Sequence, residues 1–386
     1  MAVNRILLLM ESPFSERDFR RFGVQLLREN FEVSILDCTP WIKPDFWEKY
    51  SAIAYPCPGY VAIRDFEALI SFIDRHGESV AIDFLGRCSK CASVRLALKT
   101  RKIPRVVFLH GLLPVPETTW YDKLRRLVSG NSPRSLLRFL KNRSEIILHP
   151  EPMPELALMS GVAGLDNPRA SGAAERLWAH SLDYDIYLEK SSQPVKRREP
   201  YAVFLDEDMI HHPDYDHSGI GRPTTAEAYY SAMNRFFEKT ETLIGMPVIV
   251  AAHPRSKYDL RPELWNGRKN VRDETAELVR DASLVLCHMS TSLGFAILWR
   301  KPILFLTTDD LRKSFLGSGI ALQSSLLDAP LLNVDADVDR LSAITFSLGV
   351  NERAYTKYVA DYIKRPGTPD TPVWQLFSDF LRARYQ

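Results

Sequence analysis

Three polar clusters in the second half of the 386-residue chain each follow an apolar run typical of a buried strand. They are Asp206–Asp208, His253–Arg255 and Ser290–Ser292. Ligands of open α/β sheets bind at the carboxyl ends of the strands, so we expect the three clusters to line one site. Carboxylates, an imidazole, a guanidinium and hydroxyls in one place predict phosphate-ester or glycosyl chemistry.

The cationic cluster begins with His253, which Pro254 biases away from helical backbone and towards a sharp exit from the strand. The imidazole could bind a phosphate oxygen or protonate a leaving phosphate, and Arg255 could add a second positive contact. A histidine whose ring is satisfied by a carbonyl is the alternative. Lys257 nearby favours the functional interpretation.

The acidic cluster supplies Asp206 and Asp208 as candidates to deprotonate an acceptor hydroxyl or to attack an anomeric carbon. An acidic loop that caps a helix is an alternative of equal weight for any single residue. The stretch that follows is rich in metal-ligand types, but its spacing matches no known zinc arrangement, so we expect no metal. These residues are His211, His212, Asp214, Asp216 and His217.

The hydroxyl cluster, Ser290, Thr291 and Ser292, precedes an expected helix over Leu293–Trp299. Free N–H groups, the helix dipole and hydroxyl donors together favour an anion, whereas simple helix capping is the alternative. Glu277, in the preceding helix, could reach a ribose, although such a residue more often belongs to a solvated face.

The scaffold for these clusters is expected to be α/β, because strand-like runs alternate with helical patterns throughout. The polar, proline-containing stretch 189–200 suits a linker between two Rossmann-like, doubly wound domains that face a cleft. We therefore expect an acceptor domain over 1–190, a nucleotide-sugar domain over 199–345, and helices over 346–386 that pack back on the domains. In the first domain the sequence predicts, among other elements, strands at Ala52–Tyr55 and Glu145–His149 and a helix at Ile63–Arg75.

Composition narrows the function classes. A net charge of +2 and the absence of a recognised motif argue against nucleic acid as a partner, and no apolar run is long enough to span a membrane. A cytoplasmic protein is expected. The basic stretch 123–143 is a solvated helix face or a surface for peripheral contact with anionic lipid. Cys88 and Cys91 form a single C-x-x-C pair, expected to be reduced and structural.

In their order and positions the three clusters resemble those of bacterial GT-B glycosyltransferases that use CMP-activated sugars, such as sialyltransferases and related capsule and lipopolysaccharide enzymes. The resemblance covers roughly residues 200–310. It implies a catalytic carboxylate in the acidic cluster, with His253 and the hydroxyl cluster holding the CMP phosphate. The family's acidic motif usually ends in glycine, whereas Met209 follows Asp208 here, which leaves open which carboxylate is catalytic.

A second resemblance, to bacterial surface-carbohydrate biosynthesis proteins, rests on Leu205-Asp206 followed by His212-Pro213-Asp214. Together the resemblances imply a metal-independent glycosyltransferase with no resident cofactor. It would move a nonulosonic acid or Kdo from a CMP-sugar to a saccharide or lipid-linked acceptor. An acidic base implies inversion and an acidic nucleophile implies retention. A nucleotide-sugar epimerase or hydrolase and a non-catalytic carbohydrate-binding assembly subunit are the alternatives.

Overall fold

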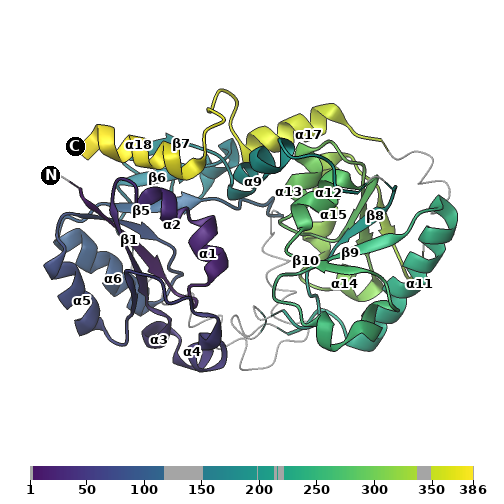
Figure 1. Cartoon of the computed structure of the whole chain (residues 1–386), viewed down its shortest axis with the longest axis horizontal. Coiled ribbons are helices and arrows are strands. Elements are labelled where there is room, and N and C mark those ends of the chain that lie inside the picture. Colours follow the sequence, from purple (N-terminus) through teal and green to yellow (C-terminus); the bar gives the residue numbers. More distant parts are fainter. Residues whose placement is uncertain are drawn as a thin grey trace. The chain divides into compact units, whose positions relative to one another are not determined.

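The computed structural model describes residues 3–116, 151–197, 199–212, 215, 221–336 and 349–385. These form two compact units, each with its own parallel sheet (Figure 1). Within the described residues, unit 1 comprises 3–112, 151–182 and 364–385, and unit 2 comprises 113–116, 183–336 and 349–363. The chain thus passes from unit 1 to unit 2 at Leu182, before the polar stretch 189–200, and the last helix belongs to unit 1.

The sheet of unit 1 has the order β3-β2-β1-β4-β5-β6-β7, and every neighbouring pair is parallel. Its strands are β1 (Arg5–Met10), β2 (Glu32–Asp37), β3 (Tyr60–Ala62), β4 (Ser79–Asp83), β5 (Arg105–Leu109), β6 (Leu156–Met159) and β7 (Glu175–Trp178). Its helices are α1 (Glu16–Arg21), α2 (Val24–Leu27), α3 (Thr39–Ile42), α4 (Pro44–Tyr50), η1 (Ser51–Ile53), α5 (Phe66–Arg75), α6 (Ser89–Thr100), η2 (Val162–Asp166) and α18 (Val373–Tyr385).

The sheet of unit 2 has the order β10-β9-β8-β11-β12-β13, again all parallel. Its strands are β8 (Ala202–Leu205), β9 (Val248–Ala252), β10 (Asn270–Arg272), β11 (Leu284–Cys287), β12 (Ile303–Thr307) and β13 (Leu331–Asn333). Its helices are α9 (Leu182–Ser191), α11 (Ala226–Ile244), η3 (Tyr258–Leu260), η4 (Pro262–Trp265), α12 (Thr275–Asp281), α13 (Leu293–Leu298), α14 (Asp309–Lys313), α15 (Gly317–Leu327), α17 (Glu352–Tyr358) and the π-helical turn η6 (Val359–Ile363).

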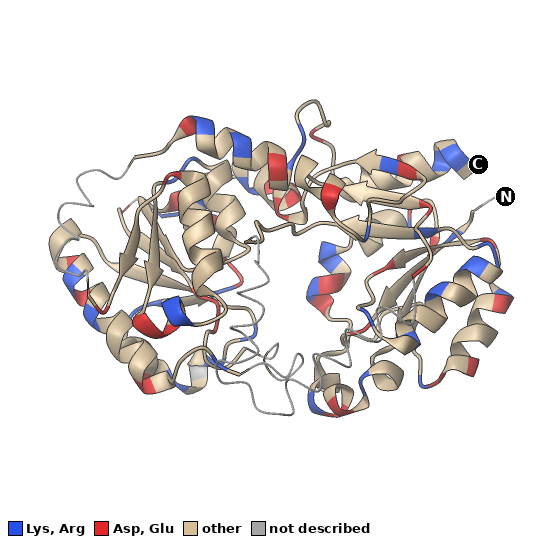
Figure 2. Cartoon of the chain, turned by 180° about the vertical axis from the view of Figure 1, so that it is seen from behind, with Lys and Arg blue, Asp and Glu red and all other residues tan. Residues whose placement is uncertain are grey.

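The strands of unit 2 carry no Lys, Arg, Asp or Glu apart from Arg272 at the end of β10, and charged residues gather on helices and loops (Figure 2). Helices cover both faces of such a sheet, so its strands are continuous apolar runs rather than alternating ones. The expected α/β class with two doubly wound sheets is therefore confirmed.

Two expected strands of unit 1 differ from the structure. Ala52–Tyr55 is wrong as a strand, because the chain there forms η1 and then passes two prolines. The third strand begins after Gly59, whose φ of 72° and close approach to the Val33 carbonyl both require glycine. The expected strand Glu145–His149 lies outside the described residues, as does the basic stretch 123–143.

The last helix, α18, packs on unit 1 through Trp374, Phe377 and Leu381, which are buried in the core beside β1 and β4. Trp374 lies against Gly23, where the chain turns from α1 into α2, and its indole N–H donates to the Arg21 carbonyl at 2.9 Å. None of the described helices is both long and apolar enough to span a bilayer.

Candidate functional site

The site lies at the carboxyl edge of the sheet of unit 2. β8 is the first strand of this unit; the chain then adds β9 and β10 on one side of it and β11 on the other (Figure 1). The pair β8–β11 is thus the point at which strand order reverses, where ligands of doubly wound sheets bind. The acidic cluster follows β8, the cationic cluster follows β9 and the hydroxyl cluster follows β11.

Asp206 joins the acidic cluster to the cationic one. Its Oδ2 accepts the His253 backbone N–H at 3.1 Å and the Tyr258 hydroxyl at 2.9 Å, and its Oδ1 accepts the Asp208 N–H at 3.1 Å. Burial raises the pKa of this carboxyl to about 7, although these donors oppose the rise. Through these hydrogen bonds the Asp206 carboxylate holds the loop after β9 against the acidic cluster.

Asp208 has a different setting. Its backbone is left-handed, with φ of 47°, and its buried Oδ1 has no hydrogen-bond partner among the described residues. Burial raises the pKa of its carboxyl as well, and the positive charges of His211 and His212 oppose the rise. A buried carboxylate oxygen without a protein partner is available to a ligand.

The two histidines at the mouth of the site form a pair. His253 Nε2 lies 3.2 Å from His212 Nε2, and His253 Nδ1 accepts the Arg255 N–H at 3.2 Å. In its neutral form His253 therefore carries its proton on Nε2 and donates it to His212, whose own proton is then on Nδ1. Both rings are only partly buried, so a ligand can reach this pair.

Glu207 joins the acidic cluster to the hydroxyl cluster, because its Oε1 accepts the Met289 N–H at 2.7 Å. Burial raises the pKa of Glu207 to about 7. His288, next to Met289, is buried and satisfied by the Leu306 carbonyl and the Tyr229 hydroxyl, so it belongs to the core. The three predicted clusters are thus tied into one edge by backbone donors and buried carboxylates.

The hydroxyl cluster has mixed exposure. Ser290 is buried and its Oγ accepts the Ser292 N–H at 3.2 Å, Ser292 is half-buried, and Thr291 is exposed. Ser292 is the residue before α13, and its side chain makes no capping hydrogen bond to that helix. The structure therefore leaves the Thr291 and Ser292 hydroxyls at the edge without a capping role.

The remaining predicted residues lie further out. Arg255 is exposed on the turn after β9. Glu277 is buried on α12, where its carboxylate pairs with Lys190 at 3.0 Å, and hydrogen bonding with Lys190 lowers its pKa despite burial. Among the described residues, Glu277 forms its ion pairs with Lys190 and Lys196 rather than with groups of the three clusters.

Sequence reasoning missed Tyr258 and Arg261 as site residues, and it considered His212 only as a possible metal ligand and as part of a resemblance motif. Arg261 Nη1 lies 3.1 Å from His211 Nε2, which brings a guanidinium to the acidic loop. Tyr258 begins η3, five residues after His253. Its position in the loop that follows β9 is the sequence feature that could have identified it as a site residue.

Two further observations concern possible metal ligands and the cavity of unit 2. Among the described residues no group of three or more His, Cys, Asp or Glu could hold a metal ion, and Asp214, Asp216 and His217 lie outside them. A cavity of about 430 Å³ in unit 2 is lined by α11 and the η4 region, and none of its lining residues belongs to the three clusters.

Comparisons with known proteins identify solved structures that have a similar fold. Neither the family models nor the curated proteins give a match. Similar solved structures include a putative UDP-N-acetylglucosamine 2-epimerase from Listeria monocytogenes (10% identity, TM-score 0.52, 100% of this chain and 97% of that chain). They also include MnaA of S. aureus in complex with UDP (12%, 0.51, 100% and 98%) and the spinosyn forosaminyltransferase SpnP (12%, 0.50, 99% and 100%). At this identity the likeness concerns the fold, and the chain has the GT-B architecture of two Rossmann-like units.

Proposed function

We propose that this protein is a nucleotide-sugar-dependent glycosyltransferase whose donor binds at the carboxyl edge of β8, β9 and β11. The observation that carries the proposal is the link between the three clusters: Asp206 accepts the His253 N–H and Glu207 accepts the Met289 N–H. Similar solved structures include a forosaminyltransferase, a putative UDP-N-acetylglucosamine 2-epimerase and a protein in complex with UDP, which supports the same class.

In this proposal Asp208 is the catalytic carboxylate. Burial raises the pKa of the Asp208 carboxyl towards neutral pH, and a general base is most effective when its pKa lies near the working pH. The buried Oδ1 of Asp208 also has no hydrogen-bond partner among the described residues. Asp206 is instead a positioning residue, because its oxygens are occupied by the donors that shape the loop.

The pair His253–His212 would meet the departing phosphate. A proton on the pair can stabilise or neutralise negative charge that develops on the leaving group. Arg255, exposed on the same turn, adds a positive charge, and the Thr291 and Ser292 hydroxyls offer donors from the opposite side of β8. Inversion or retention of the anomeric configuration depends on whether Asp208 acts as base or nucleophile.

The donor nucleotide is a separate part of the proposal. The order of the motifs favours a CMP-linked nonulosonic acid or Kdo, whereas the similar solved structures include a putative UDP-N-acetylglucosamine 2-epimerase and a protein in complex with UDP. A thermal-shift screen with UDP, CMP, GDP and CDP tests this directly. A nucleotide at about 100 times its Kd stabilises the folded chain by about 2.7 kcal/mol. A chain that no nucleotide stabilises contradicts the proposed class.

An epimerase or hydrolase is the second candidate, favoured by the likeness to the putative UDP-N-acetylglucosamine 2-epimerase from Listeria monocytogenes. Incubating the chain with UDP-GlcNAc alone separates the candidates. An epimerase or hydrolase converts the donor without an acceptor, and product analysis shows an epimer or free sugar. A glycosyltransferase leaves most of the donor unchanged until a saccharide or lipid-linked acceptor is added.

A further inference from the structure

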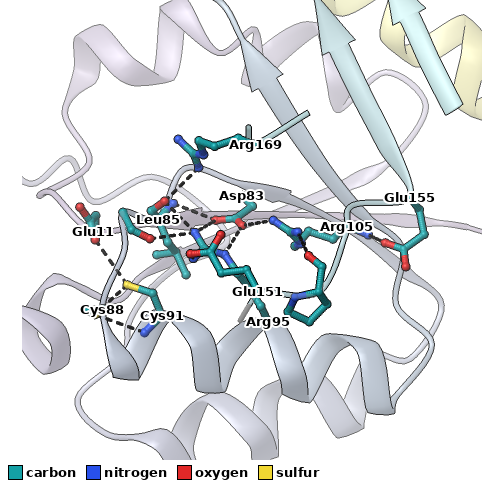
Figure 3. Close-up of polar contacts among 12 residues, drawn as sticks. Glu11, Asp83, Leu85, Cys88, Cys91, Arg95, Arg105, Glu151, Glu155 and Arg169 are labelled. Atoms are coloured by element: carbon teal, nitrogen blue, oxygen red, sulfur yellow. Dashed lines mark hydrogen bonds and ion pairs between the residues drawn. The ribbon is translucent and has the colours of Figure 1, made fainter. Parts of the chain in front are cut away.

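A second polar constellation lies in unit 1, at the point where the strand order of its own sheet reverses. This point is the pair β1–β4. Glu11 directly follows β1, and the C-x-x-C pair, Cys88 and Cys91, opens the helix that follows β4 (Figure 3). None of these residues takes part in the proposed glycosyl chemistry.

The two thiols are in contact. Their Sγ atoms lie 2.9 Å apart, and Cys88 Sγ also accepts the Cys91 N–H at 3.3 Å, so that Cys88 caps the 12-residue helix α6. Cys88 is partly exposed and Cys91 is buried. Hydrogen bonding from the Cys91 thiol lowers the pKa of Cys88 to about 6, despite partial burial. This is the asymmetry of a redox dithiol, with one accessible thiolate and one protected thiol.

Cys88 opens onto a cavity of about 170 Å³ that is also lined by three arginines, Arg87, Arg105 and Arg169, and by one carboxylate, Glu151, which is paired with Arg95. Arg105 is bound by Asp83 at 2.8 Å, whereas Arg169 donates to the Leu85 carbonyl at 3.0 Å (Figure 3). Positive charge beside a thiolate stabilises it and attracts an anionic reactant. The cavity therefore suits a small disulfide that carries carboxylates.

Cys91 has a proton acceptor of its own. Its Sγ lies 3.6 Å from Glu11 Oε2, an alternative acceptor for the one thiol proton that otherwise points to Cys88, and Lys43 donates to the other carboxylate oxygen at 2.8 Å. Gly86 makes room for this carboxylate, because a Cβ at that position would lie 2.5 Å from Glu11 Oε1. Once Cys88 is bonded to a second sulfur, Glu11 is in place to take the Cys91 proton directly as a general base.

We propose that Cys88 and Cys91 are a redox-active dithiol that a low-molecular-weight, carboxylate-bearing disulfide oxidises. The Cys88 thiolate attacks one sulfur of the disulfide, forms a mixed disulfide and releases the first thiolate. Cys91 passes its proton to Glu11 and attacks Cys88 Sγ, which forms the Cys88–Cys91 bond and releases the second thiolate. Two electrons pass from the protein to the small disulfide.

The test treats the full chain with glutathione disulfide, blocks the remaining thiols with N-ethylmaleimide after unfolding, and maps the peptides by mass spectrometry. In the unmodified chain we expect a disulfide between Cys88 and Cys91. The buried cysteines Cys38, Cys57 and Cys287 serve as internal controls and should stay reduced. Initial labelling of Cys88 in the folded chain should be at least about tenfold faster than that of these controls, because its thiolate fraction is higher.

Two serine variants assign the roles. Cys91→Ser should accumulate the mixed disulfide on Cys88, and Cys88→Ser should leave Cys91 unmodified. The proposal is overturned if glutathione distributes evenly over the cysteines, if Cys88 stays unmodified, or if the mixed disulfide forms but never closes to Cys91. If a variant fails to fold, the peptide map of the unmodified chain still shows whether the Cys88–Cys91 disulfide forms. Since no nucleotide sugar is used, the outcome is independent of the proposed glycosyl transfer.

Discussion

The hydrogen bond from Tyr258 to Asp206 gives the sharpest quantitative test of how the site is held. Replacing Tyr258 by Phe removes one hydroxyl, which donates to Asp206 Oδ2 at 2.9 Å, and leaves the buried ring in place. A hydrogen bond to a charged group contributes about 1.5–3 kcal/mol and one to a neutral group about 0.5–1.5 kcal/mol. The loss should therefore depend on whether Asp206 is ionised.

Burial holds the pKa of Asp206 at about 7, so the carboxyl is mostly protonated at pH 5 and mostly ionised at pH 8. We expect Tyr258→Phe to lower the free energy of unfolding by about 1 kcal/mol more at pH 8 than at pH 5, which corresponds to a rise of nearly one unit in the pKa of Asp206. Tyr201→Phe is the matched control, because the Tyr201 hydroxyl donates to the neutral Leu278 carbonyl at 2.7 Å.

Urea unfolding at the two pH values, followed by circular dichroism and tryptophan fluorescence, measures both variants. The control should lose about the same stability, about 1 kcal/mol, at pH 5 and at pH 8. If Tyr258→Phe shows no more pH dependence than Tyr201→Phe, Asp206 does not titrate in this range, and the account of a buried carboxylate that organises the loop is refuted.

Three further predictions concern stability. Asp206 and Glu207 hold their protons longer when folded, because burial raises their pKa values to about 7, whereas the buried His110 and His288, with pKa values lowered to about 3 and about 4, favour unfolding at acidic pH. The two contributions roughly offset each other below about pH 6.5, so the unmodified chain should lose stability only as the pH rises from there to about 8, by up to about 1.4 kcal/mol per pH unit for each carboxyl; urea midpoints that stay level over this upper range count against it. Gly23→Ala should destabilise the chain by about 1–3 kcal/mol, since φ is 55° there and the added Cβ would lie 2.4 Å from the Trp374 ring; an unchanged melting temperature would show that α18 is not tightly packed there. Arg95→Met should cost about 3–5 kcal/mol, because it leaves buried Asp83 without one of its arginines, whereas breaking the exposed pair Arg101–Asp74 should move the urea midpoint much less.

Much of the fold could be predicted because its strands are buried on both faces and read as apolar runs. The clearest examples are the apolar runs of β8 and β12 in unit 2. Short edge strands such as β3 and β10 escaped prediction, since three residues give no periodicity and their position depends on the neighbouring strand.

The site was predicted at the level of strand ends but not of contacts. The sequence suggests that acidic, cationic and hydroxyl clusters share an edge, which follows from the carboxyl ends of parallel strands. It does not show that Asp206 is enclosed by donors while Asp208 keeps a buried oxygen without a partner among the described residues, because that difference arises from the left-handed turn at Asp208. Tyr258 likewise reaches Asp206 only through the fold of the loop after β9.

The most direct test of the central claim compares Asp208→Asn with Asp273→Asn. Both aspartates have left-handed backbone, with φ of 47° and 65°, which asparagine also tolerates, but Asp273 is exposed and remote in sequence from the acidic cluster. With the nucleotide-sugar donor and acceptor that support turnover, we predict that Asp208→Asn lowers kcat about 10²–10⁴-fold while the Kd for the nucleotide stays nearly unchanged. Asp273→Asn should retain normal values for both. Equal kcat values in the two variants would contradict the assignment of Asp208 as the catalytic carboxylate.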